Sequence, residues 1–184
     1  MEELIKSALD GNKDSYVALI KSIETELFKI ASSQLNNIDD VNDAIQETIL
    51  NSYSKLHTLK NYNYFKTWII RILINECNNK NRKRKRELGL FNKISHCNSI
   101  DDNYTNKSEF QKIDSNIDFN LLIKKLKTED RLILTLHYKL QYTPTEISNI
   151  LKLNVNTIKS KILRAKQKLK QLYEKGGIND EAKK

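Results

Sequence analysis

Apolar residues recur every three or four positions along most of the chain, a spacing that predicts amphipathic helices. In the first half it predicts helices over 2–9, 13–35, 40–55 and 65–85, with a break at Gly11-Asn12. One stripe of the 13–35 helix holds the residues that we expect in a core: Tyr16, Leu19, Ile20, Ile23, Leu27 and Ile30. Four glycines and one proline supply few of the turn signals that a sandwich or barrel needs. We therefore expect an all-α fold.

The last third of the chain carries a more specific pattern. After apolar-striped helices expected over 118–126 and 129–140, the second capped by Thr128, Thr143-Pro144-Thr145-Glu146 reads as a capping box with proline at the first helical position. A break at Leu153-Asn154 precedes a long basic helix. A short helix, a tight turn and a longer basic helix together predict a helix-turn-helix. A plain three-helix bundle with a solvated basic helix is the alternative.

The stretch 89–116 between these halves is rich in Asn, Ser and Asp and has no sustained helical period. This composition is typical of a linker. The sequence thus predicts two small helical domains, over 1–86 and 118–175, joined by a flexible linker over 87–117 and followed by a frayed tail over 176–184.

The net charge of +9 is unevenly distributed. Residues 81–86 sum to +5 and residues 119–184 to +9, whereas residues 1–80 sum to −2. A basic segment favours a polyanionic partner, nucleic acid or an anionic membrane surface. No apolar run approaches the roughly 18 residues of a membrane span, and the acidic start Met1-Glu2-Glu3 is unlike a signal peptide. We therefore expect a cytoplasmic protein.

Residues that support catalysis or metal binding are scattered. The three histidines lie in different segments, and no Cys-x-x-Cys, P-loop or Gly-x-Gly-x-x-Gly motif is present. Cys77 and Cys97 are expected to be reduced thiols, since a lone disulfide in an unexported chain is improbable. The sequence predicts no metal, no cofactor, no small-molecule substrate and no enzymatic activity.

Two helix faces carry polar residues at helical spacing. An acidic strip on the 40–55 helix consists of Asp40, Asp43 and Glu47. The 65–85 helix, expected to bury Phe65, Trp68, Ile69, Ile72 and Leu73, has a polar stripe of Thr67, Arg71, Asn75, Asn78, Arg82 and Arg86. Such a stripe can lie along a nucleic-acid backbone, although a merely solvated face has the same pattern.

Three segments together resemble a known family. They are DAIQETILNSYSKL (43–56), FKTWIIRILINECNNKNRKRKR (65–86) and TPTEISNILKLNVNTIKSKILRAKQKLK (143–170). In this order and separation they resemble the two domain signatures of an extracytoplasmic-function (ECF) sigma factor of bacterial RNA polymerase. The resemblance implies a region 2 helical bundle and a region 4 helix-turn-helix that bind core polymerase and direct initiation at promoters of a stress or environmental-response regulon.

The resemblance also assigns residues. Core polymerase binding falls on Asp40, Asp43, Gln46 and Glu47. Recognition and opening of the promoter's −10 element fall on His57, Lys60, Asn61, Tyr62, Tyr64, Lys66, Thr67, Trp68, Arg71, Asn75, Asn78 and Arg82. Reading of the −35 element falls on Asn156, Thr157, Lys159, Ser160, Lys161, Leu163 and Arg164. Family members are often held inactive by an anti-sigma factor, commonly membrane-anchored, so such an inhibitor is an implied partner.

Two alternatives remain open at this level. Tyr62 and Tyr64 can stack on an unpaired base or pack under their own loop. The whole chain can also be a stand-alone helix-turn-helix regulator whose first domain serves dimerisation, which would need a self-complementary apolar face and a palindromic target. A sigma factor instead needs an acidic docking face and an asymmetric promoter.

Overall fold

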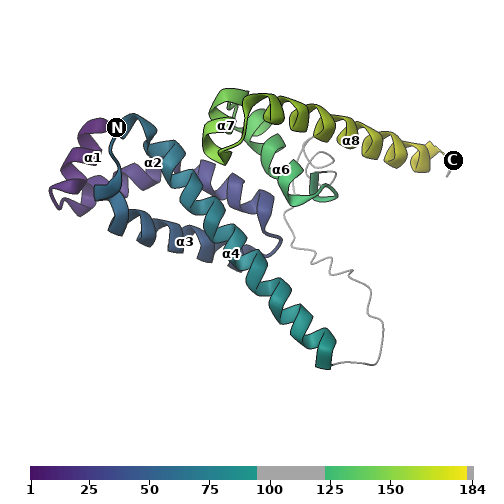
Figure 1. Cartoon of the computed structure of the whole chain (residues 1–184), viewed down its shortest axis with the longest axis horizontal. Coiled ribbons are helices and arrows are strands. Elements are labelled where there is room, and N and C mark those ends of the chain that lie inside the picture. Colours follow the sequence, from purple (N-terminus) through teal and green to yellow (C-terminus); the bar gives the residue numbers. More distant parts are fainter. Residues whose placement is uncertain (95–122, 182–184) are drawn as a thin grey trace.

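The computed structural model describes residues 1–94 and 123–181, and every regular element in these ranges is helical (Figure 1). The first half consists of α1 (Glu2–Leu9), α2 (Lys13–Gln34), α3 (Ile38–Lys55), two short 3-10 turns, η1 (Leu56–Thr58) and η2 (Tyr62–Tyr64), and α4 (Phe65–Ile94). The second half consists of α6 (Thr128–Leu134), η3 (Thr135–Lys139), α7 (Pro144–Leu151) and α8 (Val155–Glu181). The expected all-α fold is confirmed.

Local side-chain contacts explain where the first helices begin. Gly11 has a positive φ of 94°, which lets the chain turn between α1 and α2, and the Asn12 side chain then accepts a hydrogen bond from the Ser15 amide. The Asn37 side chain caps α3 in the same way, through the Asp39 amide. Both caps satisfy amide donors that a helix start leaves unpaired. The break expected at Gly11-Asn12 is confirmed.

The first half packs around the apolar stripe of α2. All six residues expected in this core are buried, and α3 and α4 lie against them. The Tyr16 hydroxyl donates to the Ile49 carbonyl at 2.7 Å and lies 2.7 Å from the Ser52 hydroxyl, so its polar end is satisfied inside the bundle. These bonds fix α3 on α2 and leave the other side of α3 facing outward.

Helix α4 differs from the expectation in length and in its buried residues. It runs to Ile94 and includes 87–94, which the sequence analysis assigned to the linker. Extending an existing helix needs no new nucleation, so this stretch can continue it despite Gly89. Phe65, Ile69 and Leu73 are buried as expected, Trp68 and Ile72 only partly. Ile70 and Ile74 are buried as well, since α7 covers α4 from a further side.

The helix-turn-helix is built as the sequence indicates. The Thr143 hydroxyl accepts from the Glu146 amide while the Glu146 carboxylate accepts from the Thr143 amide, which completes the capping box in front of α7. These bonds lower the pKa of Glu146. Helix α7 ends at Leu151, and the following residue, Lys152, caps it in the left-handed conformation with φ 54° and ψ 42°. Glycine usually fills this position, so a lysine there is strained.

Other details of the second half correct the sequence analysis. Thr128 is the first residue of α6 and not its cap, and the expected 129–140 helix becomes a π-helical segment, η3, after Leu134. Helix α8 continues through Gly176 and Gly177 to Glu181, so the expected tail is helical there. The 118–126 helix lies mostly, and the 95–117 part of the linker wholly, outside the described residues.

The two halves pack against each other. Helix α2 contacts α6 and η3, and α4 contacts α7, so one apolar core joins Leu27 and Ile70 of the first half to Ile133, Ile147 and Ile158 of the second. Within the described ranges, no helix has the length and apolar character that crossing a bilayer requires. The packing sets how the expected binding surfaces face each other.

Candidate functional site

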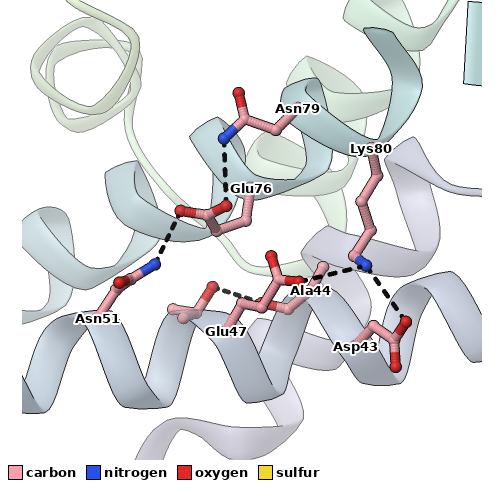
Figure 2. Close-up of polar contacts among 8 residues, drawn as sticks. Asp43, Ala44, Glu47, Asn51, Glu76, Asn79 and Lys80 are labelled. Atoms are coloured by element: carbon pink, nitrogen blue, oxygen red, sulfur yellow. Dashed lines mark hydrogen bonds and ion pairs between the residues drawn. The ribbon is translucent and has the colours of Figure 1, made fainter. Parts of the chain in front are cut away.

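Two residues of the acidic strip, Asp43 and Glu47, extend from α3 towards Lys80 of α4 (Figure 2). Lys80 reaches between these two carboxylates, with Nζ 3.3 Å from Asp43 Oδ2 and 3.7 Å from Glu47 Oε1. The side chains of Asp43 and Glu47 are nevertheless 60% and 52% exposed, and Gln46 beside them is exposed too. Asp40 is half-buried. Three of the four expected docking residues are thus accessible to a partner.

The environment of Lys80 keeps this strip in place. Partial burial lowers the pKa of Lys80, but its hydrogen bond to Asp43 and the charges of Glu47 and Asp40 outweigh burial and raise it overall. One turn away, the Glu76 carboxylate accepts from the side-chain amides of Asn51 and Asn79 (Figure 2). Together these contacts hold α3 on α4 and keep the strip in a fixed orientation.

The sequence analysis missed an apolar neighbour of the strip. Leu50, one turn after Glu47, is 70% exposed, the highest value among the large hydrophobic side chains of the described residues. Leu50 lies at helical spacing from Asp43 and Glu47 and outside the buried stripe of α3, so its position in the sequence already indicated that it is exposed. An exposed leucine beside acidic residues is typical of a docking surface with an apolar contact inside a polar rim.

The loop between α3 and α4 separates its two tyrosines. Leu59 is buried beneath the loop, and the Asn61 side chain accepts from the Asn63 amide to close η2. Tyr62 packs against the core, whereas Tyr64 is 57% exposed. Only Tyr64 therefore presents its ring to a partner. The remaining loop residues of the expected set, His57, Lys60 and Asn61, are exposed.

The polar stripe of α4 is partly occupied by contacts within the chain. Lys66 pairs with Glu26 of α2 at 2.8 Å, and the Arg71 guanidinium donates to carbonyls of α7. The Arg82 guanidinium hydrogen-bonds the Asn79 side chain. Thr67 and Trp68 are half-buried, with the Trp68 ring 6.1 Å from that of Phe65. Asn75, Asn78 and Arg82 remain exposed, so the stripe is accessible chiefly towards its carboxyl-terminal end.

Helix α8 presents a second polar face. Asn154 caps it by accepting from the Asn156 amide at 2.8 Å, while Ile158, Ile162 and Ala165 are buried against the second half. Of the seven residues expected to read DNA, six are exposed: Asn156, Thr157, Lys159, Ser160, Leu163 and Arg164. The seventh, Lys161, is half-buried and pairs with Glu129 of α6 at 2.9 Å.

Residues of both faces that were expected to bind nucleic acid line one cleft of about 1670 Å³. Its walls include Arg71, Asn75, Asn78 and Arg82 from α4, and Asn156, Thr157, Ser160, Lys161 and Arg164 from α8. Lys159 and Leu163 are not among its lining residues, and the acidic strip of α3 lies elsewhere. Lys152 also lines the cleft. The sequence analysis missed Lys152, although a lysine in place of the usual turn glycine was a visible signal.

Comparison with known families gives two consecutive matches. Residues 19–87 match Sigma-70 region 2, and residues 118–169 match Sigma-70, region 4. The first contains α3, the connecting loop and α4 up to residue 87, and the second contains the helix-turn-helix. A stand-alone helix-turn-helix regulator is therefore not favoured, because the first half is a sigma region in its own right.

Individual relatives agree with both matches. The chain is 21% identical to the ECF RNA polymerase sigma factor SigW of Bacillus subtilis over 93% of its own length and 95% of that relative. It is 27% identical to the ECF RNA polymerase sigma factor SigM of the same organism, over 76% of this chain and 82% of SigM.

The fold is shared with solved structures. The sigma factor RpoE, in its complex with the anti-sigma factor NepR from Bartonella quintana, superposes with a TM-score of 0.69 at 23% identity, over 86% of this chain and 96% of that one. With both sigma regions matched in order and ECF relatives aligned along most of its length, the chain belongs to the sigma-70 family of RNA polymerase sigma factors, among its ECF members.

Proposed function

We propose that three surfaces of this sigma factor divide its work. The acidic strip (Asp40, Asp43 and Glu47), together with Gln46, docks on a basic coiled coil of core polymerase. The 56–64 loop and the α4 stripe recognise and open the −10 element, and α8 reads the −35 element. The observation that supports this division is that the outward faces of α3 and α8, the loop residue Tyr64 and the carboxyl-terminal part of the α4 stripe are exposed, while the opposite sides of these helices are buried.

The −35 reader is the outward face of α8. Lysine and arginine side chains there can bind phosphate or guanine edges, serine and asparagine can bond either, and Leu163 can contact a thymine methyl. Lys159→Ala and Arg164→Ala should each weaken binding to the −35 duplex. Loss of a base contact costs roughly 1 to 3 kcal/mol and relaxes specificity at one base pair, whereas loss of a phosphate contact weakens all sequences alike.

The matched control on the same helix is Lys170→Ala, because Lys170 pairs with Glu174 well beyond the expected reading positions. Its affinity for the −35 duplex should stay near that of the unsubstituted protein. If Lys159→Ala and Arg164→Ala bind every duplex as well as this control does, α8 is not the reader.

The −10 contact centres on Tyr64, whose exposed ring can stack on an unpaired base. Tyr64→Ala should remove the stacking, worth about 1 to 3 kcal/mol, and slow promoter opening, whereas Tyr64→Phe should retain it. Equal opening rates for the two variants, followed by a fluorescent base in the −10 element, would refute this role.

The partners and the compartment follow from the family. As the related RpoE is seen with an anti-sigma factor, we propose that an anti-sigma factor, membrane-anchored in many systems, holds this chain inactive until a stress or environmental signal releases it. Its place of work is the cytoplasm, where polymerase and promoters are. It acts by binding, and the catalysis of RNA synthesis belongs to the polymerase.

A further inference from the structure

Lys152, in the turn between α7 and α8, holds a backbone conformation that suits glycine better than lysine. Its φ of 54° and ψ of 42° lie in the left-handed region, where the backbone crowds a β carbon. Among the described residues, Gln141 is the only other non-glycine residue with a positive φ. Glycine adopts this conformation without crowding. Residues held in such conformations cluster at functional sites.

The contacts that build this turn do not involve the Lys152 side chain. The Lys152 amide and the Leu153 amide both donate to the Ser148 carbonyl, and the Ser148 hydroxyl donates to the Leu153 carbonyl at 2.6 Å. The Asn154 side chain then caps α8. These bonds use only the backbone of residue 152, so a glycine would make them equally well. The turn itself therefore does not explain a lysine.

The Lys152 ammonium group is not used by the described part of the chain. The residue is exposed, and within the described ranges it forms no ion pair or side-chain hydrogen bond. By contrast, Lys161 and Lys168 of the same cleft pair with Glu129 and Asp130 of α6 at 2.9 and 2.6 Å. These two pairs also occupy both carboxylates among the residues that line the cleft. The positive charge of Lys152 is therefore available to a partner.

Lys152 lies next to the surface that we propose reads DNA. It precedes Val155, the first residue of α8, by three positions, and it lines the same cleft as Thr157, Ser160 and Arg164. In a helix-turn-helix, the first residues of the recognition helix contact base edges in the major groove. A long side chain directly before that helix, on the same cleft, can therefore reach the sugar-phosphate backbone at the edge of the groove.

The chemistry of this side chain favours a phosphate over a base edge. An ammonium group is a point charge on a flexible four-carbon stem. Reading a base requires donors in a fixed orientation, and no hydrogen bond from the described residues orients the Lys152 ammonium group. A phosphate needs only charge within reach, and phosphate contacts fix the position of a protein on the duplex.

We propose that Lys152 binds a backbone phosphate beside the −35 element and thereby fixes the position of α8 in the major groove. This inference rests on the proposed reading of the −35 element by α8. The lysine makes the turn less stable than a glycine would, but it places a positive charge at the edge of the groove. Such a loss of stability in exchange for binding is common at functional sites.

The test measures the promoter affinity of the complete holoenzyme, this chain with core polymerase, over a salt series. Lys152→Gly and Lys152→Asn both remove the charge and introduce residues that tolerate the left-handed conformation. Each should weaken binding about three- to tenfold at low salt, by the same factor on promoters with a substituted −35 base pair. Because one phosphate contact is lost, this factor should fall about three- to fourfold between about 50 and 200 mM salt.

Two controls separate the charge from the backbone. Lys152→Arg keeps the charge and the crowded β carbon, so it should bind like the unsubstituted protein. Lys170→Ala removes a lysine of α8 that pairs with Glu174, and its affinity should be unchanged. If Lys152→Gly and Lys152→Asn bind as well as Lys170→Ala does, or if Lys152→Arg binds as weakly as they do, the phosphate contact is overturned.

The stability of Lys152→Gly gives a second readout that a purely structural lysine would not produce. The proposal predicts that this variant unfolds at a higher urea concentration than the unsubstituted protein and yet binds the promoter more weakly. A lysine that only supported the turn would change stability and affinity in the same direction. A variant that loses both stability and affinity would therefore contradict the proposal.

These outcomes are distinct from those that test the proposed reader. If Lys159→Ala and Arg164→Ala weaken −35 binding while Lys152→Gly does not, only the phosphate contact is refuted. If Lys152→Gly and Lys152→Asn weaken promoter binding while the substitutions at Lys159 and Arg164 do not, the contact is supported and α8 is not the reader. If none of these variants weakens binding, both proposals fail.

Discussion

Neutralising the acidic strip is the sharpest perturbation of polymerase binding. We choose Asp43→Asn with Glu47→Gln, since reversed charges would place two cations against Lys80, only 3.3 and 3.7 Å away. In the free protein the Asp43 and Glu47 side chains are more than half exposed while that of Lys80 is 16% exposed. Each pair is therefore worth only about 1 kcal/mol, and a basic partner can replace Lys80. Against a desolvated basic surface each carboxylate contributes more, and the double variant should lose about 2 to 4 kcal/mol of binding free energy. That is roughly a 30- to 700-fold rise in Kd.

The assay is equilibrium binding of the fluorescently labelled protein to core polymerase over a series of salt concentrations. The difference between unsubstituted and variant protein should shrink as salt rises, because ionic strength screens exposed charges. Asp14→Asn with Glu24→Gln makes the same two chemical changes at exposed positions of α2 and should leave Kd unchanged. A double variant that melts like the unsubstituted protein and binds within twofold of it would refute the docking role.

Three further predictions concern the fold. Thr143→Ala should destabilise region 4 by about 1 kcal/mol in urea unfolding. The Thr143 bonds lower the pKa of Glu146 from 4.5, so the Glu146 carboxylate should contribute fully to stability above about pH 4.5 and lose this contribution as pH falls through the lowered pKa. Glu146→Gln should therefore be as stable as the unsubstituted protein only in acid. Lys152→Gly should relieve the strain of the left-handed backbone and raise the free energy of unfolding by about 0.5 to 1 kcal/mol. As a control, Lys166→Gly within α8 should lower the free energy of unfolding by about 1 kcal/mol. If both variants are less stable than the unsubstituted protein, Lys152 is not strained. Burial raises the pKa of Cys77 to about 12, so iodoacetamide at pH 8 should modify this thiol only in urea.

The sequence predicted those features that neighbouring residues determine. The stripe of α2, the Asn12 break and the Thr143 capping box each depend on contacts within a few positions, which periodicity and capping rules describe. The exposed strip of α3 was predictable too, because Asp43 and Glu47 fall opposite an apolar face. The resemblance to ECF sigma factors then predicted which partner each exposed face binds, which the spacing of polar residues along a helix does not indicate.

The features that the sequence did not predict depend on contacts between distant segments. Ile70 and Ile74 are adjacent to the expected polar stripe of α4, and nothing local indicates that α7 buries them. Likewise, the attachment of Arg71 to the α7 carbonyls joins residues 78 positions apart. The separation of Tyr62 from Tyr64 depends on how the 56–64 loop lies on the core.

The central claim, that this chain directs core polymerase to promoters, is tested most directly by mapping transcript starts. Purified core polymerase transcribes genomic DNA of the organism that encodes the chain, with and without this protein, and the 5′ ends are sequenced. The account predicts new starts that follow two shared sequence elements at a fixed spacing, and inserting about half a helical turn between the elements should abolish them. A set of starts identical to that of core polymerase alone would contradict it.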